Sequence, residues 1–319
     1  MTTDVLVTGG CGYIGSDLIP RLTDDDRVGQ VVVLDSLASG SPRALMGAVN
    51  GDLEFRRGDV REYGDVESAM RGVDTVVHLA AITGAASTHD RREETVAVNY
   101  DGTENILTAA GKLGVENVVL ASSCNVYGRA TSTDIDETVA PDPINPYAET
   151  KLDSEALLAE SCEEFGMDGT ALRMATNFGY SPGVRFNLVV NYFVFRALTG
   201  RTLTVYGDGS NWRPFIHVSD AARAYKHAAL ESDAWDQRIY NVGHNDANYR
   251  ISEIADVVDE EVGAVDITYL EDEHPGPSYH VNFDRLAETG YEPQTTLREG
   301  VRDIARRFTA DDASGASVP

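Results

Sequence analysis

Short apolar runs alternate with helix-length stretches over the first half of the chain. The runs are rich in β-branched residues and apolar at nearly every position, which is typical of strands covered by helices on both faces. The pattern predicts an α/β fold with a Rossmann-type, doubly wound parallel sheet. The expected strands are 4–8, 31–35, 53–57, 75–78, 118–121 and 169–173, and the expected helices are 13–22, 65–71, 95–110 and 147–165.

The rhythm becomes irregular after Asn177, where glycine and proline interrupt the chain. An apolar helix is expected at 187–199, followed by a helix at 218–230 and a strand at 238–242. This change predicts a smaller C-terminal lobe. The expected division is a sheet domain of residues 1–175 to which 214–243 return, a lobe of 176–213 and 244–310, and a loose tail over 311–319.

The chain is strongly acidic, with 26 Lys and Arg against 52 Asp and Glu among 319 residues and a formal net charge of −26. Such a field repels phosphate backbones, so no nucleic-acid partner is expected. The acid excess favours a salt-adapted source over a merely acidic enzyme, because salt screens the self-repulsion. With no membrane-length apolar run and no basic leader, we expect a cytoplasmic protein without a membrane partner. Three cysteines without ligand spacing predict no metal site.

A glycine-rich turn follows the first expected strand, in the sequence Gly9-Gly10-Cys11-Gly12-Tyr13-Ile14-Gly15. Gly9 permits the tight turn, Gly12 lets the backbone approach a pyrophosphate, and Gly15 lets the next helix pack closely. Asp35 ends the second strand about 20 residues later, where a carboxylate accepts hydrogen bonds from the adenosine ribose. The motif predicts a dinucleotide site, and Asp35 favours NAD because it would repel a 2′-phosphate.

Tyr147 and Lys151 are four positions apart in an expected helix, so their side chains share one face. A neighbouring ammonium and the positive nicotinamide ring are expected to lower the pKa of the phenol toward working pH, which suits Tyr147 to general-base catalysis. Lys151 could also bind the nicotinamide ribose. Ser123 closes the fifth strand, where its hydroxyl could bond the reacting oxygen. Cys124 is interpreted as a packing residue, because no histidine is placed to activate it.

These motifs and their order resemble the extended short-chain dehydrogenase/reductases of the NAD-dependent nucleotide-sugar epimerase/dehydratase family, with a likeness to UDP-glucose 4-epimerases. The resemblance runs from about Val5 to Arg306. It implies an NAD-binding Rossmann domain, a substrate-binding C-terminal lobe, nucleotide-sugar substrates and a homodimer formed through two helices per subunit. The matching segments are TGGCGYIG at 8–15, HLAA at 78–81, NYDGTENIL at 99–107, SSCNVYG at 122–128, YAETK at 147–151 and RPFIHVSDAARAY at 213–225.

The resemblance also assigns roles to single residues. It implies that Ser123, Tyr147 and Lys151 are catalytic, and that substrate is bound by Ser123, Asn177, Arg185, Asn187 and Arg213. Asp59 and Val60 are as well explained by an ordinary strand-end turn as by adenine binding, Ser122 also fits a strand-end cap, and His78 is given no chemistry. The predicted cofactor-binding residues are Gly9, Gly12, Tyr13, Ile14, Gly15, Asp35, Ser36, Ser39, Gly40, Asp59, Val60, Leu79, Ala80, Ala81, Asn99, Ser122, Tyr147 and Lys151.

Two departures from the family pattern bear on the reaction. In 4,6-dehydratases an Asp-Glu pair follows the residue that corresponds to Ser123, whereas this chain has Cys124 and Asn125. His274 stands where the family often has an arginine of the diphosphate site. The first departure predicts a 4-epimerase that oxidises C4 transiently and returns the hydride. The alternatives are a sugar oxidoreductase or dehydratase of the same family, or an NAD-sensing regulator, which the intact Ser-Tyr-Lys set disfavours.

Overall fold

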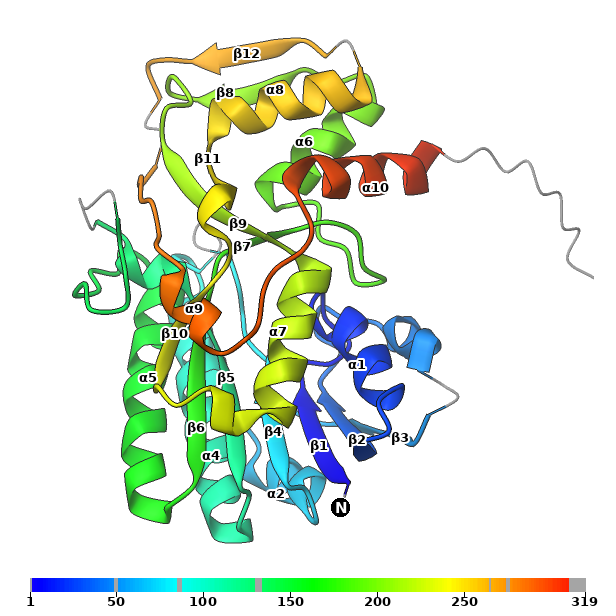
Figure 1. Cartoon of the computed structure of the whole chain (residues 1–319), viewed down its shortest axis with the longest axis vertical. Coiled ribbons are helices and arrows are strands. Elements are labelled where there is room, and N and C mark those ends of the chain that lie inside the picture. Colours follow the sequence, from blue (N-terminus) through cyan, green and yellow to red (C-terminus); the bar gives the residue numbers. More distant parts are fainter. Residues whose placement is uncertain are drawn as a thin grey trace, which may run out of the picture.

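A computed structural model describes residues 2–48, 51–84, 88–129, 134–263, 265–273 and 276–309. Figure 1 shows a large sheet flanked by helices, with a second lobe above it. His274 and the tail 311–319 lie outside the described residues. Among the described helices, none combines the length and apolar character needed to cross a membrane.

The main sheet has seven parallel strands in the order β10-β6-β5-β4-β1-β2-β3, which confirms the predicted fold class. Every predicted strand of the first half is present, and several extend beyond the apolar run because their ends pair with a neighbouring strand. The strands are β1 (Thr3–Thr8), β2 (Val28–Asp35), β3 (Leu53–Arg57), β4 (Thr75–His78), β5 (Asn117–Ser123), β6 (Asp168–Met174) and β10 (Ile239–Val242).

Two apolar clusters cover the two faces of this sheet. Helices α1 (Gly15–Thr23) and α7 (Val218–Leu230) pack together in the first cluster. Helices α2 (Tyr63–Met70), α4 (Gly102–Leu113) and α5 (Pro146–Phe165) form the second. The carboxyl ends of β1, β4 and β5 therefore lie at one edge between two helical layers, where α/β folds bind ligands.

The helix predicted at 95–110 is interrupted. It consists of α3 (Arg92–Val96), a π-helical turn at Ala97–Asp101 and α4. The side chain of Asn99 in that turn is used for tertiary hydrogen bonds, and such π turns occur frequently at functional sites. The spacing of apolar residues predicts a continuous helix here, because that spacing does not reveal one extra residue in a single turn.

The second lobe is built on two small sheets and three helices. Its apolar core is separate from the two clusters of the main sheet. The strands are β7 (Thr176–Phe178), β9 (Trp212–His217) and β11 (Asn248–Arg250) in one sheet and β8 (Leu203–Tyr206) with β12 (Ile267–Leu270) in the other, and the helices are α6 (Val189–Leu198), α8 (Ile251–Val262) and α10 (Leu297–Thr309).

The chain crosses between the two parts more often than predicted. Residues 214–217 pair with β7 and β11, so they belong to the second lobe and the return to the main sheet begins at α7. A later segment, which includes α9 (Asp284–Glu288), packs into the main core through Tyr279, Phe283 and Tyr291. Residues 279–291 therefore join the sheet domain, and the predicted second lobe over 244–310 is interrupted there.

Candidate active site

The glycine turn is built for close backbone contact. Gly9 has φ +70°, and a Cβ there would lie 2.7 Å from the backbone nitrogen of Ala80 after β4. A Cβ on Gly15 would lie 2.5 Å from the Cα of Gly10. At Gly12 a Cβ would meet only the Gly9 carbonyl oxygen, at 3.1 Å. Gly9 and Gly15 thus close the turn, while Gly12 leaves its outer side open to a ligand, as a pyrophosphate site requires.

Asp35 fixes the turn from the end of β2. One carboxylate oxygen accepts a hydrogen bond from the Cys11 backbone N–H at 2.9 Å, and the other accepts from the Leu37 N–H at 2.7 Å. Each oxygen keeps a second lone pair, so the carboxylate can still accept from ribose hydroxyls. The residues present therefore fit a dinucleotide. In the loop that follows, Ser36 and Ser39 are exposed and Gly40 packs against Cys11.

Tyr13 joins the glycine turn to the second lobe. Its hydroxyl donates to the Gly179 carbonyl oxygen at 2.6 Å and accepts from Asn191 Nδ2 at 3.2 Å. The lobe also reaches the turn at Gly183, where a Cβ would lie 2.6 Å from the Gly12 carbonyl oxygen. The Tyr13 hydroxyl is thus committed to the lobe, and the predicted cofactor contacts of Tyr13 and its neighbour Ile14 would be made by other atoms.

The side chains of three predicted cofactor contacts are bonded within the protein, and their contact with the cofactor stays a prediction. The Ser122 hydroxyl donates to Glu155 Oε1 at 2.5 Å. Asn99 is 1% exposed, and its amide bonds both backbone groups of Ile82, so it holds the segment after β4. The Asp59 carboxylate binds the Arg61 guanidinium at 2.6 Å.

The segments that follow β3 and β4 flank the glycine turn. Leu79, Ala80 and Ala81 are half-buried beside Gly9, while Val60 is buried in the apolar cluster of α2 and α4. His78 precedes them with both ring nitrogens in hydrogen bonds to threonine hydroxyls, and burial lowers its pKa to about 3. A neutral, fully bonded imidazole packs the sheet.

Ser123, Tyr147 and Lys151 meet at the carboxyl end of β5. Asn145 caps α5 by accepting from the Ala148 N–H at 2.9 Å, and Pro146 follows at the first helical position, which places Tyr147 in the first turn. The Lys151 ammonium lies 5.9 Å from the centre of the Tyr147 ring. All three side chains are largely buried.

Burial shifts the pKa values of both Tyr147 and Lys151 in the protein without cofactor. Burial raises the pKa of Tyr147, and the opposing effects of a hydrogen bond with Ser123 and of the nearby Arg185 charge are smaller. Burial lowers the pKa of Lys151 to about 8, although the Glu155 charge acts to raise it. Without cofactor, desolvation dominates both groups. The expected lowering of the phenol pKa involves the positive nicotinamide ring as well as Lys151, and it stays a prediction for the protein with NAD bound.

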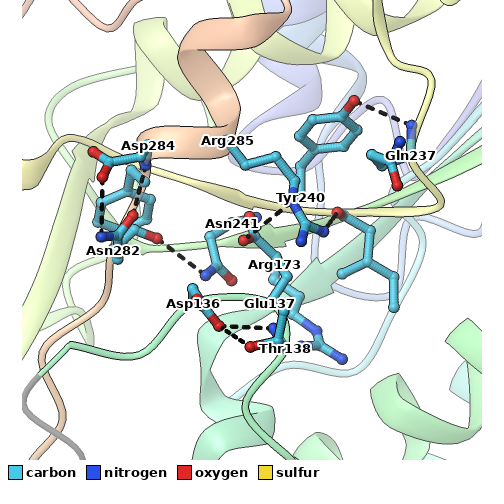
Figure 2. A network of polar contacts seen from close by, with 12 residues as sticks. Asp136, Glu137, Thr138, Arg173, Gln237, Tyr240, Asn241, Asn282, Asp284 and Arg285 are labelled. Atoms are coloured by element: carbon cyan, nitrogen blue, oxygen red, sulfur yellow. Dashed lines mark hydrogen bonds and ion pairs between the residues drawn. The ribbon is translucent and has the colours of Figure 1, made fainter.

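A buried polar network that the sequence analysis missed lies behind the catalytic strand. Glu155, one turn beyond Lys151, forms an ion pair at 2.7 Å with Arg173 of β6 and accepts from Ser122. Arg173 donates to the Tyr127 hydroxyl, which donates to Asn241 Oδ1 at 2.7 Å. Figure 2 shows the continuation of this network through Asn241 and Glu137 to Arg285. The helical spacing from Lys151 to Glu155 was the available signal.

Two arginines of the second lobe approach the same region. Arg185 donates to the Thr83 hydroxyl after β4, and Arg213 of β9 lies 4.8 Å from the ring centre of Tyr279. Burial lowers the pKa of both guanidinium groups. Among residues that the structure describes, neither arginine pairs with a carboxylate. Desolvated cations without a carboxylate partner suit an anionic ligand.

The two predicted asparagine contacts differ in their surroundings. Asn177 donates to the Ala175 carbonyl oxygen at 3.1 Å, and its own Oδ1 is buried without a partner among the described residues. Asn187 is exposed and accepts from Arg185 Nε at 3.3 Å. Asn177 therefore keeps an acceptor free for a ligand, whereas the Asn187 side chain is bonded to Arg185.

Comparison with known proteins decides the family. A sequence profile described as the NAD dependent epimerase/dehydratase family matches residues 5–243. The chain belongs to this family. Its cofactor is NAD, in agreement with the glycine turn and Asp35.

Relatives of this epimerase/dehydratase family member span the whole chain. A low-salt glycan biosynthesis protein of Haloferax volcanii is 30% identical and covers 97% of this chain and 99% of its own length. A dTDP-glucose 4,6-dehydratase of an Actinoplanes species is 30% identical, with 96% and 98% covered. The crystal structure of the Thermus thermophilus UDP-glucose 4-epimerase with NAD is 28% identical, with a TM-score of 0.82 and coverage of 96% and 99%. Both a 4-epimerase and a 4,6-dehydratase thus occur among its relatives.

Proposed function

We propose that this chain is an NAD-dependent nucleotide-sugar 4-epimerase. The observation that carries the proposal is the chemistry beside Ser123. Cys124 is 1% exposed, its thiol contacts the Arg173 carbonyl oxygen at 3.1 Å, and burial raises its pKa well above the ordinary range. Asn125 bears an amide, which is neither an acid nor a base near neutral pH. Neither residue can remove a C5 proton or assist loss of a C6 hydroxyl.

The remaining groups suffice for oxidation and reduction at C4. Bound NAD supplies the hydride acceptor and donor. Tyr147 would take the proton of the C4 hydroxyl and give it back, and Ser123 would hold the same oxygen by a hydrogen bond. Lys151 would bind the nicotinamide ribose and stabilise the phenolate of Tyr147 through its charge. Turning the ketone in the site before the hydride returns would invert C4.

The unpaired arginines support a diphosphate-linked substrate. Arg213 and Arg185 are held by Tyr279 and Thr83, and both lie where burial disfavours a bare charge. A nucleoside diphosphate would supply the missing negative charge. The Asn177 Oδ1 atom, buried and unpartnered, would accept from a substrate hydroxyl or amide. One solved relative is a UDP-glucose 4-epimerase, so UDP-sugars are the first substrates to test.

The test is proton NMR of the enzyme with a panel of nucleotide sugars in heavy water. We expect C4 epimers to interconvert without deuterium at C5. Deuterium at C5 or a new C6 methyl signal would show dehydratase chemistry, the reaction of the Actinoplanes relative. Stoichiometric release of reduced cofactor would instead show a net oxidoreductase, and the absence of any turnover would support a regulatory protein.

A further inference from the structure

The Ser123 hydroxyl receives two hydrogen bonds from the same residue. The backbone N–H of Asn125 donates to Ser123 Oγ at 3.2 Å, and the side-chain Nδ2 donates to it at 3.1 Å. A serine hydroxyl has two lone pairs and one proton. With both lone pairs occupied, the hydroxyl can only act as a donor toward a third group. The group left for that donor is Tyr147, because interaction with Ser123 acts to lower the Tyr147 pKa against the larger effect of burial.

The orientation of the Asn125 amide is set by a tyrosine of a distant segment. The Tyr279 hydroxyl donates to Asn125 Oδ1 at 3.3 Å, across 154 positions in the sequence. Tyr279 is 2% exposed, and burial raises its pKa to about 12, so the phenol keeps its proton. In this orientation the amide oxygen accepts from the Tyr279 hydroxyl and the amide nitrogen donates to Ser123.

The position of Tyr279 is itself fixed from the second lobe. Its backbone N–H donates to the Trp212 carbonyl oxygen at 3.1 Å, and the Arg213 guanidinium lies 4.8 Å from its ring centre. The ring and the hydroxyl therefore serve different partners. The ring supports Arg213, and the hydroxyl bonds Asn125.

We propose that Asn125 and Tyr279 are positioning residues that hold the Ser123 hydroxyl as a hydrogen-bond donor, toward Tyr147 in the free protein and toward the reacting sugar oxygen once substrate is bound. The proposal rests on the proposed function only in taking Tyr147 as the base. A donated hydrogen bond favours the charged form of the phenol. The same donor would stabilise negative charge on the C4 oxygen as its proton leaves. In this arrangement Asn125, which stands where the dehydratases have an acid, orients the Ser123 hydroxyl.

The experiment compares Asn125→Ala, Tyr279→Phe and the double variant by steady-state kinetics over a range of pH. One neutral hydrogen bond of this kind corresponds to a fall in kcat of about 2- to 10-fold for Tyr279→Phe. KM should change little, because Phe keeps the ring beneath Arg213. We expect a larger fall for Asn125→Ala, and no further fall when Tyr279→Phe is added to it.

The pH profile separates positioning from a general loss of structure. Weakening the Ser123 donor raises the pKa of Tyr147, so the acid limb of kcat should move to higher pH in both variants. Tyr291→Phe is the matched control, because it removes a buried hydroxyl bonded at 2.5 Å to the Asp220 carbonyl oxygen from a ring that lies beneath Arg223. That control should leave kcat and its profile unchanged.

Asn125→Asp keeps the shape of the side chain, the acceptor for Tyr279 and the backbone N–H donor, but removes the side-chain donor to Ser123. It should lose at least about tenfold in kcat, since the hydroxyl proton would turn to the carboxylate. An Asp variant with wild-type kcat, additive effects of the two single changes, or a Tyr279→Phe effect confined to KM would each overturn the proposal. Circular dichroism and NAD binding establish that each variant is folded.

A second readout is independent of the sugar reaction. The phenolate absorbance of Tyr147 is obtained without substrate, as the difference between each protein and the same protein carrying Tyr147→Phe. Its titration should move to higher pH in Asn125→Ala, and an unmoved titration would overturn the proposal. If no sugar is epimerised but the titration moves, the 4-epimerase assignment fails and the role of Asn125 stands.

Discussion

Lys151 combines a catalytic role with a cost to stability, and replacing it by methionine should reveal both. The lysine is 3% exposed, and within the part of the chain that the structure describes its ammonium has no hydrogen bond or ion pair. Burial lowers its pKa from 10.5 to about 8. Methionine keeps most of the stem and removes the charge. The variant should therefore be inactive and yet more stable than the native protein without cofactor.

The magnitude follows from the pKa. At 1.36 kcal/mol for each unit, a fall from 10.5 to about 8 corresponds to about 3 kcal/mol of destabilisation by the charged lysine. The folded pKa is the lower one, so the penalty is complete below about pH 8 and disappears as pH rises toward 10.5. The free energy of unfolding of the Lys151→Met variant should exceed that of the native protein by about 3 kcal/mol at pH 7 and by about 1 kcal/mol at pH 10.

The assay is urea unfolding of the cofactor-free proteins at both pH values in the same KCl concentration. Cofactor must be removed, because any ligand of the native state adds its own stabilisation. Lys112→Met is the matched control, since Lys112 is exposed on α4, and it should change the free energy of unfolding by less than about 0.5 kcal/mol. A Lys151→Met variant less stable than the native protein at pH 7, or a difference that does not shrink at pH 10, would refute the reasoning.

Two further predictions test the base and the charge. Tyr147→Phe should bind NAD and remain folded but lose about 10²- to 10⁴-fold in kcat, whereas Cys124→Ala should cost little; comparable losses in both would contradict the assignment of the base. The melting temperature should rise with KCl into the molar range, because screening weakens repulsion among the 52 acidic residues, and a flat or falling curve in differential scanning calorimetry would contradict this.

Local features of the fold and the site could be predicted from the sequence. The turn at Gly9 and the carboxylate of Asp35 act on backbone within one βαβ unit, so spacing along the chain determines their geometry. Tyr147 and Lys151 share a helix face, and helical spacing suffices to bring them together. In each case the partners lie close in sequence or in a repeating arrangement of strand and helix.

Contacts between distant segments could not be predicted in the same way. The bond from Tyr279 to Asn125 depends on the segment that returns to the main core after the second lobe, a crossing for which no spacing rule exists. The bond from Ser122 to Glu155 was missed because the two residues lie on different elements. The effect of burial on the Tyr147 pKa could not be predicted for a related reason. Proximity to Lys151 was visible in the sequence, but burial of both groups was not.

The buried cations of the site favour the binding of ligands and lower the stability of the folded protein. In a chain with a net charge of −26, acidic partners are abundant, yet Arg185, Arg213 and Lys151 are desolvated without one among the described residues. Packing alone would favour replacing such groups by apolar side chains. Their retention is understandable if bound anionic and hydroxyl groups complete them. Ligand binding then supplies the electrostatic stabilisation that the folded protein lacks.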